Sequence, residues 1–432
     1  MKKMSTSTDT KDIALTIYNG GFGAVKEKRA VQLEKEDRVL IFADVAQQIE
    51  TDSLMVEGIN VLEFNYDFDL VDRNKLLQKY VDKEVYLQDR ETREKRSCRL
   101  LSAGEGGWVL EDLKTKEIYM DSQQEIILPS LPSGLIVKPA LVWKTDGKTA
   151  ESVKVSYLSR GFNWQANYVV ELKETSLSLN GWAEIENRSG MTFDNARIKL
   201  IAGEVNRLEK EIRMDRMYVA EESGASYEPE VKPFFDYHMY TIKQPTTLKD
   251  NQSKQISIIT GIDIPYKQYY KLGLYEEKAD IIVEFQNRKE EGLGLAMPQG
   301  KIKLYKEDAA DGSLEFIGED GIKHTPKNEA VTLSIGKAFD IAFDYKKIDH
   351  QKKDGVEYYK YRCIIRNHKN TEAEVRFEHH RSGVWEMVNT THPYEKISSN
   401  QIEFQVKVAA EEEVAVEFEY RMDWRQEVIL KK

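Results

Sequence analysis

The sequence predicts a mostly β protein built from several antiparallel β-sandwiches. Apolar and polar residues alternate through residues 153–202, so that Val153, Val155 and Tyr157 share one face of a strand. Such alternation is typical of antiparallel sheets that bury one face and expose the other. Tyrosine is abundant, at 22 residues, and its ring and hydroxyl suit half-buried strand positions. Asp311-Gly312 and Asp354-Gly355 add hairpin signals.

Four parts are expected, because one hydrophobic core rarely organises a chain of 432 residues. Residues 1–70 are an N-terminal β segment, which includes the alternating run from Ile13 to Tyr18 and the turn residues Asn19-Gly20-Gly21. Residues 71–130 are expected to form a small SH3-like or Sm-like barrel, inserted between the β segments.

The barrel prediction depends on a short helix that leads into five short strands. Asp72 or Asn74 can cap the helix, and Leu76, Leu77 and Tyr80 share a stripe on its surface. The strands are expected at residues 84–87, 98–101, 107–110, 117–120 and 125–128.

Residues 131–290 are expected to form a central β-sandwich, and residues 291–432 a C-terminal, immunoglobulin-like β-sandwich. A polar stretch at about residues 214–252 interrupts the central part and is the best candidate for a mobile excursion. A weak echo links the two parts, because Asn187 and Asn367 each lie two residues past an isoleucine at a strand end. Asparagine there can bond the turn backbone, and the echo favours two sandwiches of similar plan.

The composition limits which binding partners and which cellular compartment are expected. The formal net charge of −11 argues against generic binding to nucleic acid or anionic lipid. Two distant cysteines, Cys98 and Cys363, exclude a disulfide framework and a cysteine-rich zinc site. No run approaches the roughly 18 apolar residues that a membrane span needs, and the N-terminus does not read as a signal peptide. We therefore expect a cytoplasmic protein.

Several segments also resemble a known family when they are taken in order. They are Tyr66-Asp-Phe-Asp-Leu, Lys75-Leu-Leu-Gln-Lys-Tyr-Val, Leu131-Pro-Ser-Gly-Leu-Ile-Val-Lys-Pro-Ala-Leu-Val-Trp, Tyr157-Leu-Ser-Arg-Gly-Phe-Asn-Trp-Gln-Ala-Asn-Tyr, Phe235-Asp-Tyr-His-Met-Tyr and Gly336-Lys-Ala-Phe-Asp. Together they resemble the domain-of-unknown-function 4139 family, whose relatives include mucoidy-inhibitor-like proteins. The resemblance covers most of the chain. It implies a mostly β, multidomain protein and no established activity, cofactor or catalytic residue, although many relatives look exported.

No pattern of residues predicts a catalytic centre, a cofactor site or a metal site. His379 and His380 are adjacent on an expected strand, so their side chains point to opposite faces and do not bind one ion together. The aromatic residues between Tyr157 and Trp182 either build the sandwich core or form a stacking platform for sugar rings or a peptide, and their periodicity favours the core. The candidate contact surface comprises Arg160, Trp164, Tyr168, Trp182, Tyr237 and His238.

These observations favour a non-enzymatic, β-rich binding or scaffolding protein that recognises a protein or itself. Whether it also binds a small molecule is unknown from the sequence. The alternative is a hydrolase that acts on a glycan or peptide, with a site assembled between domains from distant histidines and carboxylates. A weaker alternative is RNA binding by the small barrel, whose residues 88–100 carry five basic against three acidic side chains. Alternating charges on a solvated hairpin explain that modest excess better.

Overall fold

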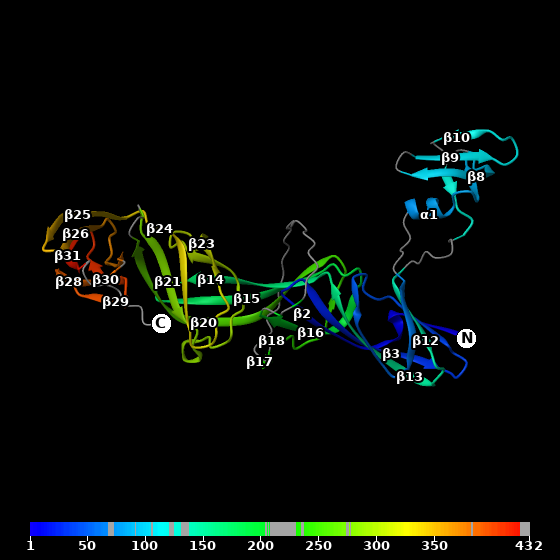
Figure 1. The fold of residues 1–432 in the computed structure, drawn as a ribbon, viewed down its shortest axis with the longest axis horizontal. Coiled ribbons are helices and arrows are strands. Elements are labelled where there is room, and N and C mark those ends of the chain that lie inside the picture. Colours follow the sequence, from blue (N-terminus) through cyan, green and yellow to red (C-terminus); the bar gives the residue numbers. More distant parts are fainter. Residues whose placement is uncertain are drawn as a thin grey trace. The chain divides into compact units, whose positions relative to one another are not determined.

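The structure, a computed structural model, is mostly β and consists of several sheets (Figure 1). It describes residues 1–67, 73–90, 92–104, 107–120, 125–130, 138–203, 205, 207, 230–234, 237–273, 276, 278–381 and 383–423, with backbone alone at 230–234 and 237. Its helical segments are α1 (Arg73–Lys79) and two 3-10 turns, Ser7–Asp9 and Lys289–Glu291. The predicted mostly β fold class is confirmed.

The chain divides into two compact units. One comprises residues 1–163, 186–200 and 244–253, and the other comprises residues 164–185, 201–243 and 254–432. Each unit thus gathers segments that are far apart in the sequence. The four-part division expected from the sequence remains a prediction.

The first unit contains two sheets formed largely by the N-terminal strands. The four-stranded sheet has the order β1 (Lys2–Ser5), β4 (Val39–Ala43), β12 (Ala140–Thr145) and β6 (Val61–Asp67). The second sheet contains, side by side, β16 (Phe193–Ala202), β2 (Thr10–Tyr18), β3 (Phe22–Leu33), β13 (Ala150–Arg160) and β5 (Ile49–Glu57), and β19 (Thr246–Leu248) pairs with β16. The alternating residues Ile13, Leu15 and Ile17 of β2 are buried, as their period of two requires.

The small sheet that follows α1 contains the five strands expected from the sequence. Its order is β10 (Ile118–Met120), β9 (Gly107–Asp112), β8 (Lys95–Gly104), β7 (Glu84–Gln88) and β11 (Glu125–Ile127). Every pairing is antiparallel, and a separate core of residues such as Val85, Cys98 and Leu110 lies on one face, together with Tyr80. Among the described residues the outer strands β10 and β11 do not pair, so the sheet is open.

The second unit is dominated by a large sheet. Its main path is β23 (Leu314–Ile322), β22 (Gly300–Glu307), β14 (Phe162–Leu172), β15 (Ser176–Asn187), β20 (Gln252–Leu272), β27 (Ala373–His380), β30 (Gln401–Val408) and β29 (Tyr394–Ser398). β21 (Asp280–Gln286) pairs with β20, and β24 (Ala330–Lys337) pairs with β21. Two pairings are parallel, β14 with β22 and β20 with β27.

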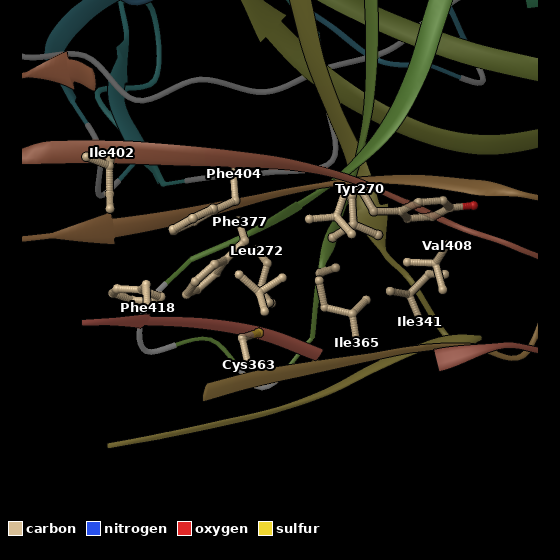
Figure 2. Packing of buried hydrophobic residues seen from close by; sticks show 14 of the residues in the cluster. Tyr270, Leu272, Ile341, Cys363, Ile365, Phe377, Ile402, Phe404, Val408 and Phe418 are labelled. Atoms are coloured by element: carbon tan, nitrogen blue, oxygen red, sulfur yellow. The ribbon is translucent and has the colours of Figure 1, made fainter. Parts of the chain in front are cut away.

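A four-stranded sheet packs against β27 and β30 of the large sheet. We call these two layers the C-terminal sandwich. The order of this four-stranded sheet is β25 (Ile341–Lys353), β26 (Val356–Asn367), β31 (Glu413–Asp423) and β28 (Trp385–Thr390). Figure 2 shows side chains of this sheet, such as Cys363 and Phe418, facing Phe377 and Phe404 of β27 and β30 across the core. Both sheets bury alternate residues, which is how two packed sheets form one core.

The expected excursion at about residues 214–252 is only partly described, because residues 208–229 lie outside the described residues. Its remainder contains the hairpin of β17 (Glu230–Phe234) and β18 (Tyr237–Thr241), followed by β19. The two cysteines are buried and unbonded to each other. Burial raises the pKa of the Cys98 thiol and raises the pKa of Cys363 to about 12.

Candidate functional site: the polar end of the C-terminal sandwich

Along its strands, the inner face of the C-terminal sandwich changes from purely apolar side chains to hydroxyl-bearing aromatic rings. On β26, Ile365 and Cys363 point into the core, and the same face continues with Tyr361 and Tyr359. The neighbouring antiparallel strand β31 places Phe418 and Tyr420 on the same face, with Tyr420 opposite Tyr359. Because side chains on one face recur every second residue, aligned strands bring these hydroxyl-bearing rings together.

We call this group the tyrosine–histidine cluster; it comprises Tyr345, Tyr359, Tyr361, His379 and Tyr420. His379 comes from β27, on the opposite sheet, and is only 3% exposed. Its ring centroid lies 5.1 Å from that of Tyr361 and 5.4 Å from that of Tyr420. Its Nδ1 atom is 2.9 Å from the Tyr345 hydroxyl, which is hydrogen-bond distance. The cluster therefore joins both sheets through polar as well as apolar contacts.

Burial determines the protonation of the cluster. Burial is the main reason that the pKa of His379 falls to about 3, and the nearby charges of Arg381 and His380 contribute to the same shift. Burial also raises the pKa of Tyr345 and of Tyr420 well above the usual range. At neutral pH the imidazole is therefore neutral and both phenols keep their protons.

The rim of the cluster carries charged groups. The Tyr359 hydroxyl donates to the Glu357 carboxylate, and this bond is the main reason that the pKa of Glu357 falls to about 2. The guanidinium carbon of Arg381 lies 4.7 Å from the ring centroid of Tyr359 and 5.3 Å from that of Tyr420. Arg381 thus stacks across two rings as a cation over aromatic faces.

Buried polar atoms at this end lack good hydrogen-bond partners among the described residues. Nε2 of His379 and Nε of Arg381 have none, and the hydroxyl of Tyr420 makes only a marginal contact, with Tyr361. A buried polar atom without a partner costs about 1–3 kcal/mol, so native proteins leave few of them. These groups therefore mark this end of the sandwich as a candidate polar site.

The residues of the candidate contact surface have different environments. The Trp164 indole is buried and donates to the Ile201 carbonyl at 3.0 Å, while the buried Tyr168 hydroxyl donates to the Pro298 carbonyl at 2.7 Å. Both are enclosed and hydrogen-bonded, as residues of a hydrophobic core are.

Three other members, Arg160, Trp182 and His238, reach the surface. The Arg160 side chain is exposed and lies 3.6 Å from the Glu50 carboxylate. Trp182 is half-buried and His238 is exposed, whereas the side chain of Tyr237 lies outside the described residues. Among the described residues, no hydrogen bond, ion pair or ring contact joins Arg160, Trp182 and His238 to one another, so their shared role remains a prediction.

The sequence analysis considered His379 only as a metal ligand. The expectation that His379 and His380 face opposite sides of β27 is confirmed, because the His380 side chain is 52% exposed and lies 3.6 Å from Glu378. The sequence does place Tyr359 and Tyr361 on the same strand face as Cys363, but it gives no indication that these rings meet His379 of the opposite sheet.

The described residues contain no group of three or more histidine, cysteine or acidic side chains arranged to hold a metal ion. Among them, too, no helix has the length and apolar character required to cross a membrane.

Comparison with known proteins identifies the family. No curated protein matches the chain. The family model described as a domain of unknown function, DUF4139, matches residues 153–426, which include the large sheet and the C-terminal sandwich. The resemblance seen in the sequence is thereby confirmed, and the chain belongs to the DUF4139 family.

Proposed function

We propose that this protein is a non-enzymatic, β-rich binding or scaffolding protein whose partner is another protein or a second copy of itself. The observation that best supports this is the location of its exposed apolar side chains. More than half of the large ones in the described chain lie on strands at the edge of a sheet. They are Met4, Met55, Leu62, Phe64, Ile118, Met120, Leu314, Phe316, Ile348, Val388, Tyr394 and Ile397.

Edge strands are natural contact surfaces, because one side of their backbone is free to pair and exposed apolar groups gain from burial. β28 and β29 are the edge strands at one side of the C-terminal sandwich. The Trp385 indole of β28 donates to the Ser399 carbonyl at 3.0 Å, and the Lys396 ammonium of β29 lies 5.0 Å from the same ring. These contacts hold the two edges close together.

A register shift in each of the edge strands β28 and β29 coincides with an exposed apolar side chain. The register of β28 shifts around Val388, and that of β29 shifts around Ile397. A β-bulge re-aims the side chain of its extra residue, and Val388 and Ile397 are 48% and 51% exposed. Two exposed aliphatic side chains on neighbouring edge strands are better suited to contact with another protein than to binding of a soluble metabolite.

The experiment is light scattering coupled to size-exclusion chromatography of the full chain, over a range of protein and salt concentrations. We expect concentration-dependent association that the double substitution Val388→Lys, Ile397→Lys weakens. Ile262→Lys is the matched control, because Ile262 is 62% exposed but lies on the interior strand β20. A strict monomer that also retains no partner from its native lysate at any salt concentration would contradict the proposal.

A second candidate is a hydrolase that acts on a glycan or peptide. The hydrogen bond between Tyr345 and His379 is the observation in its favour. A general base works best with a pKa near the operating pH, whereas that of His379 falls to about 3. The rings that enclose His379 include Tyr361, Tyr420 and Phe418, rather than a carboxylate that would orient the imidazole. Loss of measurable hydrolysis in His379→Ala would favour the hydrolase.

RNA binding by the small sheet is a weaker candidate. Its arginines are engaged with neighbours: Arg96 donates to the Tyr119 hydroxyl at 3.0 Å, and Arg99 donates to Glu111 at 2.8 Å. Binding through phosphate contacts would weaken steeply with salt in a filter-binding assay, and we expect no such slope.

We include three finer assignments in the proposal. The facing sheets of the C-terminal sandwich support an immunoglobulin-like plan, and the helix followed by five antiparallel strands supports an SH3-like barrel. A cytoplasmic location is supported by the free, buried thiols of Cys98 and Cys363, which fit a reducing compartment.

A further inference from the structure

We propose that the tyrosine–histidine cluster and Arg381 form a binding site for a small oxyanion, such as a carboxylate or phosphate group. The cluster adjoins the edge strand β28, whose Trp385 ring centroid lies 6.2 Å from that of Tyr420, but the proposal does not depend on the edge-strand contacts. The inference rests on three features of the polar end of the sandwich: its unpartnered polar atoms, the hydrogens that these atoms carry, and the charge of Arg381.

The first feature is the burial of groups whose hydrogen-bonding capacity is unused. His379 is 3% exposed, yet Nε2 of its imidazole has no partner among the described residues. Tyr420 is 1% exposed, and its hydroxyl makes only the marginal contact with Tyr361. Because each such group is costly to bury unpaired, their proximity indicates that an occupant completes them.

The second feature is that these groups present hydrogens. A neutral imidazole carries one N–H, and when the Tyr345 hydroxyl donates to Nδ1, the proton of His379 lies on Nε2. The Tyr420 hydroxyl and Nε–H of Arg381 add two further donors. A set of donors selects an occupant that accepts hydrogen bonds.

The third feature is the charge of Arg381, which has no carboxylate partner in the part of the chain that the structure describes. Acidic side chains are nearby on the adjoining strands, but they pair elsewhere. Glu357 lies 3.3 Å from the Lys352 ammonium, and Glu378 lies 2.8 Å from that of Lys271. An uncompensated guanidinium beside neutral donors selects an anion, and oxyanions match its fork of N–H groups.

The cluster is also open to solvent at its rim. Tyr345, Tyr361 and Arg381 are only half-buried, in contrast to His379 and Tyr420. An oxyanion would therefore meet these half-buried side chains first, whereas Nε2 of His379 is enclosed.

The experiment compares sodium phosphate, sodium benzoate and sodium chloride at equal ionic strength, with the full chain as the receptor. We expect phosphate or benzoate, but not chloride, to raise the thermal midpoint and to give a saturable titration by calorimetry. The two anions distinguish the sources, because benzoate represents a carboxylate on an aromatic ring and phosphate represents a free or ester-linked phosphoryl group.

Substitutions locate the binding. Arg381→Gln should weaken it at least tenfold, and Tyr420→Phe, which removes only the hydroxyl, should weaken it severalfold. Arg421→Gln is the matched control, because Arg421 is exposed and already bonded to Glu386; its affinity should equal that of the unaltered protein. Circular dichroism checks that each variant is folded.

Three results would overturn the site. One is that neither anion binds more tightly than chloride, and another is that a folded Arg381→Gln variant binds as well as the unaltered protein. The third is a high-resolution crystal structure, grown with the anion, in which water alone bonds His379 Nε2 and the Tyr420 hydroxyl.

Discussion

Asn187 and Asn367 form the same pattern of hydrogen bonds at the ends of β15 and β26. Asn187 is fully buried, and its Nδ2 donates to the carbonyl four residues further on, that of Met191, at 2.8 Å. It also donates to two consecutive carbonyls of a distant segment, those of Leu248 and Lys249. Its Oδ1 accepts from the backbone N–H two residues on. One side chain thus ties its own turn to another segment.

Asn367 repeats each of these contacts. Its Nδ2 donates to Thr371, again four residues on and at 2.8 Å, and to the consecutive carbonyls of Val408 and Ala409. Its Oδ1 likewise accepts from the backbone N–H two residues on. The weak echo in the sequence therefore corresponds to one shared way of closing a strand end, which supports the interpretation of two regions of similar plan.

Replacing either asparagine by alanine should therefore lower the free energy of unfolding by roughly 3 kcal/mol, since several buried carbonyls lose their donor at once. Urea denaturation followed by circular dichroism measures this. Asn370→Ala is the control, because Asn370 is exposed and next to the same turn, and surface changes of this kind stay within about 0.5 kcal/mol. Equal effects at Asn367 and Asn370 would contradict the assigned role.

The stability of the protein should fall in mild acid because of His379. Its pKa is about 3 in the folded protein against an ordinary value of 6.5, so the unfolded chain takes up the proton first. The stabilisation is complete above about pH 6.5 and is lost as the pH falls toward 3. Between pH 6.5 and pH 5 the loss is about 2 kcal/mol.

Urea denaturation at several pH values tests this. His379→Gln should flatten the pH dependence in that window. His380→Gln, on the exposed face of the same strand, should leave the slope unchanged. An identical slope in both variants would show that His379 is not responsible.

The buried ion pair of Glu27 and Arg29 should respond differently to single and double substitution. Both side chains are fully buried, with Nε of Arg29 at 2.7 Å from Glu27. The remaining guanidinium donors bond the same carboxylate and the carbonyls of Ser5, Ala43 and Asp44. Arg29→Met leaves a buried, unpaired carboxylate and should cost about 3–5 kcal/mol. Arg29→Met combined with Glu27→Leu should cost less, and thermal unfolding ranks the three proteins.

Gly161 should tolerate alanine less well than Gly21 does. Both have positive φ, at +85° and +81°, which costs about 1–2 kcal/mol for a residue with a Cβ. A Cβ on Gly161 would also lie 2.6 Å from the Arg188 carbonyl oxygen, whereas one on Gly21 would meet nothing within 4 Å. Gly161→Ala should therefore lower the melting temperature more than Gly21→Ala, and calorimetry of both variants decides the point.

Sequence periodicity was enough to predict the faces of strands but not their neighbours. Val153, Val155 and Tyr157 of β13 are expected on one face, and all three are buried. The tyrosine–histidine cluster was not foreseen, because its members lie on four strands whose pairings join distant parts of the chain. A period of two shows which way a side chain points, whereas register and the opposing sheet depend on tertiary packing.

The two buried thiols can report separately on the opening of two hydrophobic cores. Cys98 lies in the core of the small five-stranded sheet and Cys363 in that of the C-terminal sandwich. A thiol reacts with an alkylating reagent only after it meets water and ionises, so each cysteine is modified at the rate at which its own surroundings open. Mass spectrometry of the peptides that contain Cys98 and Cys363, taken from one alkylation time course, would report how often each core opens.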